Sequence, residues 1–541
     1  MDKDPFFVKV LCGIISIELR KDEEAMYLVT AGEMQQMDQA TINEIGIPGR
    51  ILMENAGAGA FRFMCRVFAE LLDGNVAVVA GRGNNGGDGF VIARHLFQKD
   101  VSVKVFLLSA VDKVQGDARA NLDLLFALGI PVVEVPDNDT FRKQKAALRK
   151  YDIYVDAIFG TGLNSDVRGH YREVIRFLNS LTQPVFSVDI PSGINADNGQ
   201  ICGISIEAAA TATFAFPKIG HAVYPGADLT GALDIVEIGV PTQVVTRVRP
   251  RQFLIQKEML AEIIQERDPN THKGKTGHLL VVAGAPGKSG AAAMTATAAM
   301  RVGAGLVTLG VPEGLHAVIE PQVTEVMTYA LPQTTDGMLD ELGLDAVLRL
   351  AKGKRCLVVG PGIGMAEETK AFMQGLLGAN KLPLVIDADG LNLLAEQIDK
   401  FKPRRYPLIL TPHPGEMGRL CAVSAAEIQK NRIEHARSLA TRLGAHVVLK
   451  GAATVMAHPD GSVFVNSSGN SGMASGGMGD VLSGAIAGFV TQGYAPKDAI
   501  HLGVYLHGAA ADHLWQNKGP FGYLATEVMN QLPEQIRNLM P

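Results

Sequence analysis

The sequence predicts an α/β protein of two doubly wound domains, each a three-layer sandwich with helices on both faces of a mainly parallel sheet. Two observations lead to this fold class. From Tyr27 onward, short β-branched runs alternate with helix-period segments, a repetition that is typical of parallel sheets covered on both faces. The chain also has 541 residues, which is more than one hydrophobic core usually supports.

The first half of the chain holds the first alternating series. Its predicted strands are Val76–Ala80, Val101–Leu108, Ile153–Ile158, Val185–Ile190 and Ala212–Phe216. Its predicted helices include Gly89–Gln98, Asp117–Leu128 and Arg172–Leu181. Short apolar runs bounded by turn residues are typical of buried strands. We therefore take residues 27–242 as the first domain, preceded by a disordered extension at residues 1–26.

A lapse in the pattern separates this series from a second one. Between Gly239 and Gln256 two prolines flank a short basic segment, and such stretches are typical of boundaries between domains. We take residues 251–541 as the second domain. Its predicted strands are His278–Ala283, Leu306–Val311, Cys356–Gly360, Leu384–Asp387, Pro407–Leu410 and His446–Leu449. A hairpin of Ala453–Met456 and Ser462–Val465 follows, and two helices, Gly479–Gln492 and Pro496–Trp515, close the domain.

Composition excludes several classes of protein. The net charge is −6 and no basic stripe offsets it, so we expect no nucleic-acid partner. The five cysteines are scattered without a CxxC pair, which argues against a disulfide framework or a structural zinc site and favours the reducing cytoplasm. The apolar stretch Phe6–Ile17 contains Lys9 and is too short to span a bilayer. We therefore expect no membrane segment.

Three predicted strands of the first half run into glycine and acidic residues. The segments that follow or end these strands are Asn84–Asp88, Asp156–Gly162 and Asp189–Gly193. Ligands of open α/β sheets bind beyond the carboxyl ends of the strands, and glycines there let backbone amides approach a pyrophosphate. Each segment taken alone is explained equally well as a tight turn into a helix. Three of them at consecutive strand ends favour a ligand site.

The acidic residues of these segments need a role, because carboxylates repel a phosphate. Asn85, Asp156 and Ser192 carry hard oxygen donors that would suit a cation between them. Asp189 then remains as a candidate general acid or base. Asp88 lies inside the glycine segment, so the segment does not match the dinucleotide fingerprint of a dehydrogenase.

A second candidate site lies in the other half of the chain. Gly476–Gly479 precedes Asp480 and a predicted helix; free amides at a helix start stabilise a transferring phosphoryl group, and Asp480 would act as the base for an attacking hydroxyl. A glycine turn into a buried helix is the structural alternative. Lys450–Thr454 ends another strand and could hold a nucleotide, and His413 beside Glu416 is a candidate substrate contact.

In this combination and order, the motifs resemble the family of bifunctional NAD(P)H-hydrate repair enzymes. The motifs that carry the resemblance are Val29–Met34, Asn84–Gly89, Asp156–Gly162, Val188–Gly193, His413–Met417 and Gly476–Asp480. The family joins an epimerase of YjeF N-terminal type to an ADP-dependent dehydratase of ribokinase-like fold. The resemblance runs from about Tyr27 to the C-terminal end, and it implies a Rossmann-like first domain and a ribokinase-like second domain.

The resemblance implies a substrate, NADH or NADPH that has added water at C6 of the dihydropyridine ring (NADHX or NADPHX). The first domain would interconvert the R and S forms, with Asp189 as acid or base and a potassium ion at Asn85, Asp156 and Ser192. The second would dehydrate the S form: Asp480 activates the C6 hydroxyl to attack the terminal phosphate of ADP, the donor that binds with Mg²⁺. Phosphate then leaves, and AMP and NAD(P)H are the other products.

The resemblance also implies binding residues, and we expect a homo-oligomer with these small molecules as partners. Implied contacts of the first domain are Asn84, Asn85, Gly86, Gly87, Asp88, Gly160, Thr161, Gly162, Leu163, Asn164, Ser165 and Asp166. Implied nucleotide contacts of the second domain are Lys450, Gly451, Ala452, Ala453, Thr454, Asn470, Gly476, Gly477, Met478 and Gly479. Implied substrate contacts are Ala304, Gly364 and His413.

Two other hypotheses remain open at this point. The second domain would be a vitamin or sugar kinase if Asp480 activated a stable alcohol, and its phosphorylated product would then accumulate. The first domain would be a non-catalytic module if it only bound a nucleotide or a protein. A binding module has little reason to gather acids at strand ends, which disfavours the latter.

Overall fold

The computed structural model describes residues 26–71 and 73–540. Of the predicted extension, only Met26 falls within the described residues. The described chain divides into two compact units, Tyr27–Gln252 and Phe253 onward, the second also taking Met26. The division falls within the two short strands β1 (Met26–Leu28) and β9 (Gln252–Leu254). Among the described helices, none combines the length and the apolar character needed to cross a membrane.

The N-terminal unit is built on seven parallel strands in the order β4-β3-β2-β5-β6-β7-β8. Their bounds are β2 (Asn75–Ala80), β3 (Ser102–Leu107), β4 (Val132–Glu134), β5 (Ile153–Ala157), β6 (Val185–Val188), β7 (Ala210–Phe214) and β8 (Ala232–Val236). The order changes direction between β2 and β5, and a crevice for ligands forms at the carboxyl ends of strands on either side of such a switch.

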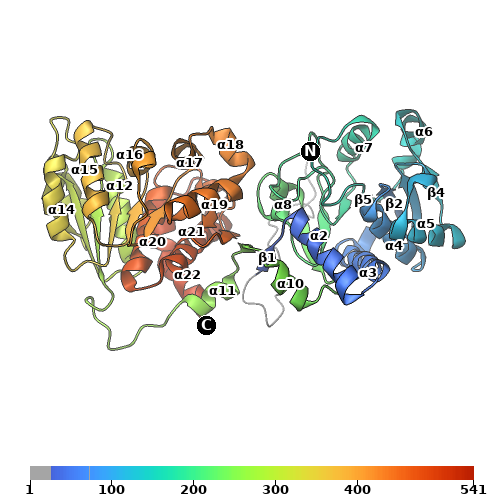
Figure 1. Ribbon diagram of the computed structural model, residues 1–541, viewed down its shortest axis with the longest axis horizontal. Helices are drawn as coiled ribbons and strands as arrows, with labels where there is room; N and C mark the ends of the chain where they lie inside the picture. Colours follow the sequence, from blue (N-terminus) through green and yellow to red (C-terminus); the bar gives the residue numbers. More distant parts are fainter. Residues whose placement is uncertain (1–25, 72, 541) are drawn as a thin grey trace. The chain divides into compact units, whose positions relative to one another are not determined.

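Helices cover both faces of this sheet (Figure 1). The helices are α2 (Ala31–Ala40), α3 (Gly49–Val67), α4 (Asn84–Phe97), α5 (Gly116–Ala127), α6 (Asn138–Leu148), α7 (Gly169–Asn179), α8 (Ile219–Ala222), α9 (Gly226–Leu229) and α10 (Thr242–Val248). A π-helical turn, η1 (Thr41–Ile45), continues α2, and short 3-10 turns lie at η2 (Ala69–Leu71) and η3 (Val111–Lys113). One core holds α3, α4 and α5 against the sheet, and the core on the other face holds α6 and α7.

The C-terminal unit has a larger sheet, whose order from β18 is β18-β17-β16-β15-β14-β13-β10-β11-β12. Its strands are β10 (His278–Val282), β11 (Leu306–Pro312), β12 (Met327–Leu331), β13 (Cys356–Val359), β14 (Leu384–Ile386), β15 (Leu408–Leu410), β16 (His446–Leu449), β17 (Val455–Ala457) and β18 (Val463–Val465). The strands from β12 to β16 pair in parallel, and β17 and β18 pair antiparallel as a hairpin.

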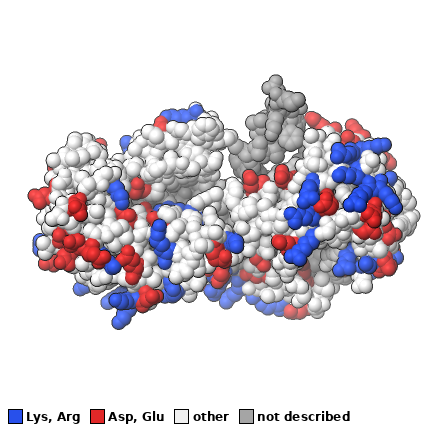
Figure 2. Space-filling model, turned by 90° about the horizontal axis from the view of Figure 1, so that it is seen from above, with Lys and Arg blue, Asp and Glu red and all other residues white. Residues whose placement is uncertain are grey.

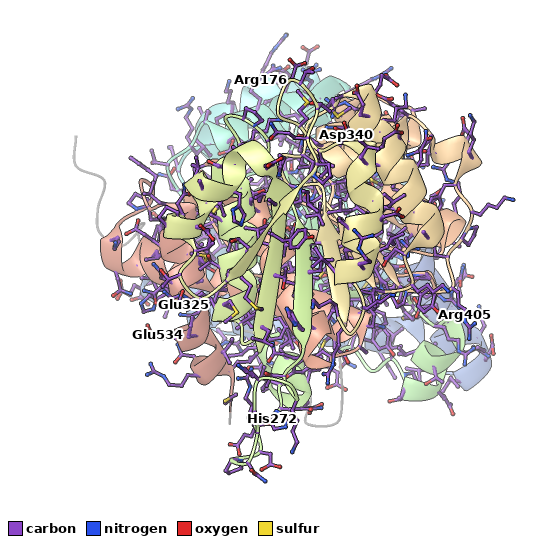
Figure 3. All side chains as sticks on the ribbon, turned by 90° about the vertical axis from the view of Figure 1, so that its left-hand side faces the viewer. Arg176, His272, Glu325, Asp340, Arg405 and Glu534 are labelled. Carbon is purple, nitrogen blue, oxygen red and sulfur yellow. The ribbon has the colours of Figure 1, made fainter. Side chains whose placement is uncertain are left out.

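Two groups of helices cover the larger sheet, as the end-on view shows (Figure 3). The helices are α11 (Lys257–Ile263), α12 (Ser289–Arg301), α13 (Glu313–Ile319), α14 (Leu344–Leu350), α15 (Glu367–Ala379), α16 (Asp389–Ala395), α17 (Pro414–Cys421), α18 (Ala425–Lys430), α19 (Arg432–Leu443), α20 (Met478–Gln492), α21 (Pro496–Lys518) and α22 (Ala525–Leu539). Four 3-10 turns complete the unit: η4 (Glu320–Gln322), η5 (Glu341–Gly343), η6 (Ile398–Lys400) and η7 (Ser471–Met473). The group α12, α20, α21 and α22 packs in the largest core.

The predicted α/β class is confirmed, and the central strands agree with their predicted ranges to within two residues. Five strands were missed: β1, β4, β8, β9 and β12. The two strands β1 and β9 have only three residues each. The edge strands β4, β8 and β12 carry partly exposed residues, because edge strands are covered less completely and so lack a continuous apolar run. The prediction that two helices close the chain was wrong. A third, α22, follows them with Pro533 inside it, and an internal proline argues against a helix at the level of sequence.

Three histidines form a buried chain at the amino end of β16, on the side of the sheet opposite its carboxyl ends. His446 Nδ1 lies 2.8 Å from His458 Nδ1, and His458 Nε2 lies 3.0 Å from His501 Nε2. Burial lowers the pKa of His446 to about 4 and that of His501 to about 3, and it also lowers the pKa of His458. The three rings are therefore neutral in the folded protein near pH 7.

We expect the C-terminal unit to lose stability as the pH falls from 6.5 toward 4. Above 6.5 these histidines are neutral in both states, and below it only the unfolded chain takes up protons. Each histidine then lowers the free energy of unfolding by up to about 1.4 kcal/mol per pH unit. Denaturant titrations followed by Trp515, the one tryptophan of the chain and part of α21, measure this slope. His501→Gln should make it shallower. The exposed-site control His272→Gln should not, and equal slopes for both variants would contradict the assignment.

Candidate active sites

The first candidate site lies at the carboxyl ends of β2, β5, β6 and β7. The segment Asn84–Gly89, predicted as a loop before the helix, is instead the first turns of α4, with Gly83 as its N-cap. Its glycines serve close packing. A Cβ on Gly86 would lie 2.0 Å from the carbonyl oxygen of Gly81, and one on Gly89 would lie 2.6 Å from Ala157 Cβ. The glycines thus bring the amino end of α4, which favours anions, down against the sheet.

A buried ion pair forms the centre of this site. Lys218 Nζ donates to Asp189 Oδ1 at 2.6 Å, to Thr213 Oγ1 at 2.8 Å and to the carbonyl of Phe214 at 3.1 Å. The Lys218 side chain is 1% exposed and that of Asp189 is 13% exposed. Removing one partner of a buried pair typically costs about 3–5 kcal/mol. Asp189 also adopts a φ of +66°, and such backbone strain is concentrated at functional sites.

Two further carboxyl groups face this pair. Burial, the charges of Asp189 and Asp38, and only partial compensation by Lys218 raise the pKa of Asp88 well above its ordinary value. Burial likewise raises the pKa of Asp38 on α2 to about 6, with Lys218 opposing the shift. The segment that leads into helix α2 is held near the site. Val29 forms an isolated β-bridge with Lys218, and its carbonyl oxygen accepts a hydrogen bond from the Ile219 amide. The site therefore combines an ion-paired carboxylate with two carboxyl groups whose pKa values are raised.

Several polar atoms around the site are buried without a partner. They are Oδ1 of Asp38, both amide atoms of Asn85 and Nε2 of His221. A Cβ on Gly160 would lie 3.3 Å from both Asn85 Oδ1 and Asp189 Oδ2, so these two side chains flank the same backbone position. Buried polar groups are nearly always hydrogen-bonded, and a cluster of unpaired ones calls for a ligand. The arrangement is that of a site prepared for a polar molecule or ion.

The three predicted cation ligands differ in their surroundings. Asn85 fits the role, because its buried amide oxygen has no partner. Asp156 is fully buried, and its oxygens accept from Ser187 Oγ, the Ser192 amide, Ser192 Oγ and the Ile158 amide at 2.6–3.3 Å. Ser192 Oγ also accepts from the Phe159 amide. Asp156 and Ser192 thus tie the ends of β5 and β6 together, and their part in holding an ion stays a prediction.

The second candidate site has a similar ion pair at the carboxyl ends of β14, β15 and β16. Lys450 Nζ donates to Asp387 Oδ1 at 2.7 Å and lies 3.8 Å from Glu416 Oε2. Ser483 Oγ donates to Asp387 Oδ2 at 2.6 Å. Asp387 is 1% exposed, so these donors are what permit a carboxylate there. The next residue, Ala388, has a φ of +50°, a second strained position at the end of a strand.

Asp480 stands in the first turn of α20, beside this ion pair. Burial raises its pKa to about 7, with the charge of Asp387 adding to the shift and Lys450 opposing it. A carboxyl group that titrates near neutral pH is well matched to accept a proton from a hydroxyl. A Cβ on Gly479 would lie 3.2 Å from Lys450 Nζ, so the glycine there admits the lysine beside the helix start.

The other predicted residues of the second site fall into different places. Gly477 is the N-cap of α20 with a φ of +90°, and a Cβ on Gly476 would meet nothing within 4 Å. Met478 packs in the core, so its side chain is turned away from a ligand. Asn470 donates to Asp512 Oδ1 at 2.8 Å and accepts from Gly472 and Tyr523. It therefore fixes the loop before α20.

The loop Lys450–Thr454 joins β16 to β17, and a buried arginine supports it. Arg432 donates to the carbonyls of Leu449 and Lys450 at 3.0 and 3.3 Å. Gly451 and Ala452 are exposed above this support. Their amides are accessible to a ligand.

Of the predicted substrate contacts, two lie at this site and one does not. His413 is half exposed and caps α17, its Nδ1 accepting from the Gly415 amide at 3.0 Å. Gly364 donates to Asp389 Oδ2, which also accepts from Lys288. Ala304 is buried immediately before β11, at the amino end of the sheet. Within one chain, Ala304 is therefore separated from Asp480 by the length of the strands.

Comparison with known proteins identifies the family. The family described as YjeF-related protein N-terminus matches residues 49–220, and that described as NAD(P)H-hydrate dehydratase matches residues 279–534. The bifunctional NAD(P)H-hydrate repair enzyme Nnr of Moorella thermoacetica is 41% identical over 95% of this chain and 97% of its own. The chain belongs to the family of bifunctional NAD(P)H-hydrate repair enzymes.

Another curated relative agrees with this assignment. The Nnr enzyme of Escherichia coli is 35% identical over 93% of this chain and 92% of its own. A solved structure of the ADP/ATP-dependent NAD(P)H-hydrate dehydratase from Bacillus subtilis, co-crystallized with ATP/Mg²⁺, is 34% identical, with a TM-score of 0.47 over 53% of this chain and 98% of that one. The family has an epimerase and a dehydratase domain, so the kinase hypothesis is not favoured.

Sequence reasoning missed the residues that surround the two predicted acids. In the epimerase-type domain these are Lys218, Asp38 and His221. In the dehydratase-type domain it is Asp387, which pairs with the predicted residue Lys450. Lys218 follows a strand, as the predicted acids do, in Phe216-Pro217-Lys218. A fourth strand that runs into a polar residue was therefore the signal that could have pointed to Lys218. Nothing in the sequence pattern points to Asp38, which lies on a helix far from the strand ends in sequence.

Lys450→Met should raise the pKa of Asp480 above about 7, because Lys450 is the cation that opposes the effect of burial. A pH titration of the carboxyl signals by infrared or carbon NMR spectroscopy measures this pKa. The difference between the spectra of the wild type and of Asp480→Asn isolates the signal of Asp480. The matched control, Lys381→Met, removes an exposed lysine before β14, at the other end of that strand. A shift equal to that of the control, or in the opposite direction, would refute this account of the charge balance.

Proposed function

We propose that this protein repairs hydrated NADH and NADPH, with Asp189 serving the epimerase and Asp480 serving the ADP-dependent dehydratase. The observation that carries the proposal is the pairing, in each domain, of a buried lysine–aspartate ion pair with a second carboxyl group of raised pKa. Acid–base catalysis near pH 7 requires neighbouring groups whose pKa values differ, so that one can donate a proton and the other can accept one. Family membership supplies the substrate class.

In the epimerase domain the reaction is loss and return of water at C6. The nitrogen lone pair next to C6 expels the hydroxyl group once it has been protonated, and this leaves a planar ring cation. Asp88 or Asp38, whose pKa values burial raises above that of an ordinary aspartate, would supply that proton. Asp189 would then accept a proton from the water that adds to the opposite face, and Lys218 holds it in place. The amino end of α4 would receive the pyrophosphate.

In the dehydratase domain the hydroxyl is made into a better leaving group. Asp480 would take the C6 hydroxyl proton as the oxygen attacks the terminal phosphate of ADP, releasing AMP. The nitrogen lone pair then expels phosphate, and loss of a proton from C5 restores the double bond. The amino end of α20 stabilises the transferring phosphoryl group through its free amides. Lys450 and the exposed amides of Gly451 and Ala452 would hold the nucleotide.

Two ions belong to this proposal. A potassium ion in the epimerase domain would take Asn85 Oδ1, which has no protein partner, as one ligand; it would help neutralise the carboxylates near the substrate phosphates. Magnesium in the dehydratase domain would enter with the nucleotide phosphates, as this ion usually does. Neither ion is needed to explain the lysine–aspartate pairs.

The two activities should separate cleanly by mutation. With each epimer supplied separately, Asp189→Asn should abolish interconversion and leave ADP-dependent recovery of NADH from the S form. Asp480→Asn should do the reverse, with a loss of at least about a hundred-fold in the dehydration rate. Absorbance of reduced cofactor and release of orthophosphate follow the second reaction, and chromatography of the epimers follows the first. A phosphorylated product that accumulates would indicate a kinase instead.

Gly160→Ala should slow epimerisation by about ten-fold, because the added methyl group lies 3.3 Å from both Asn85 Oδ1 and Asp189 Oδ2 and displaces them. The control is Gly378→Ala on α15, outside both predicted sites, where a Cβ likewise meets nothing within 4 Å. Dehydration of the S form should be unchanged in both variants. Equal epimerisation rates in the two variants would show that the Asn85–Asp189 geometry is not that of the reaction.

A further inference from the structure

A pocket of about 520 Å³ opens on the C-terminal unit, lined by Met365, Asn392, Ala395, Glu396 and Arg419. This volume is within the range of small-molecule sites, which is about 300–1,000 Å³. Its walls come from α16 and α17 and from the residues just before α15, three helices that contact in sequence order and are seen together in Figure 1. None of these lining residues was among the predicted contacts.

The pocket begins next to the reaction centre. Met365 follows Gly364, whose amide donates to Asp389 Oδ2 at 3.0 Å. Asn392 lies one helical turn after Asp389 on α16. The charge of Asp389 in turn contributes to the raised pKa of Asp480, so the two carboxyl groups are within electrostatic reach. Asp389 thus lies between the two: it is within electrostatic reach of Asp480, and its neighbours Gly364 and Asn392 adjoin or line the pocket.

The charge of the pocket suits a phosphate. Arg419 is exposed, and its Nη1 donates to Asn392 Oδ1 at 2.9 Å. Across the described chain no carboxylate forms an ion pair with it. Glu396, the one acid in the lining, pairs with Lys370 Nζ at 2.6 Å. Arginine offers several N–H donors in a planar array that matches phosphate oxygens, and here this array is not committed to a protein carboxylate.

The lining of the pocket favours one occupant over the other. The proposed nucleotide loop follows β16, whereas the pocket lies among the helices that follow β13, β14 and β15. None of the residues proposed to hold the phosphoryl donor lines it. The hydrated ring occupies only one end of its dinucleotide, so a molecule whose ring lies at Asp480 has a pyrophosphate and an adenosine still to be bound.

We propose that the pocket binds the adenosine-side half of the hydrated dinucleotide, with Arg419 in contact with a phosphate of that half. The inference rests on the proposed function and adds a second anchoring point to it. The phosphate is either the pyrophosphate, which both cofactors carry, or the 2′-phosphate, which only NADPH carries. Arg419 is thus a binding residue, and in the second case it sets the preference for NADPH hydrate.

Binding is measured without turnover in an Asp480→Asn background, using the S forms of hydrated NADH and NADPH. Adding Arg419→Gln should weaken binding by roughly ten-fold or more, as expected for loss of a charge-assisted hydrogen bond, and Arg419→Lys should lose less. Weakening for both hydrates assigns the pyrophosphate, and weakening for the NADPH hydrate alone assigns the 2′-phosphate. The matched control, Arg537→Gln, removes an exposed arginine of α22 that pairs with Glu534 and should change neither affinity.

Unchanged affinity for both hydrates would overturn the proposal, and so would weaker binding of ADP in place of the hydrates. Trp515 emission and thermal unfolding show whether each variant is folded. Failure of the proposed function has a different signature. In that case the protein without any substitution does not regenerate NADH from its hydrate and ADP, and this result does not depend on the affinities measured for the Arg419 variants.

Discussion

Both sites depend on a lysine buried against an aspartate at the carboxyl end of a parallel strand. Lys218 Nζ lies 2.6 Å from Asp189 Oδ1, and Lys450 Nζ lies 2.7 Å from Asp387 Oδ1. Burying a carboxylate alone costs several kcal/mol, so the lysine is what permits more than one carboxyl group in each site. The same cation limits how far the pKa of its neighbours rises, and this leaves Asp480 titrating near pH 7.

The parallel sheets explain how these groups come together. Their strands all end at one edge, so side chains that are far apart in sequence meet there. Close packing then sets the geometry: Gly86 and Gly89 bring α4 against the sheet, and Gly479 admits Lys450 beside α20. Asp189 and Ala388 hold positive φ values directly after strands, a strain of about 1–3 kcal/mol each. The surrounding packing must offset that strain.

Elsewhere the surface is ordinary. Acidic and basic side chains are interspersed over the face seen in Figure 2, and the charged residues labelled in Figure 3, such as Glu325 and Arg405, lie at the periphery of that view. The distinctive electrostatics are therefore those of the interior: the two ion pairs, Asp88 with its raised pKa, and the neutral histidine chain near β16. Among the residues that line the pocket, Arg419 forms no ion pair with a carboxylate of the described chain, and its partner Asn392 lies one helical turn from Asp389.

The amino-acid sequence alone determined the fold class, the central strands, the two acids at strand or helix ends, and the family. Those features are local, because β-branched runs and glycine segments mark strands and turns directly. It could not show that Asn84–Gly89 is helical, that edge strands exist at β4, β8 and β12, or that α22 tolerates Pro533. Only the tertiary structure placed Lys218 and Asp38 beside Asp189 and moved Ala304 away from Asp480, because pairing and burial join residues that no sequence spacing connects.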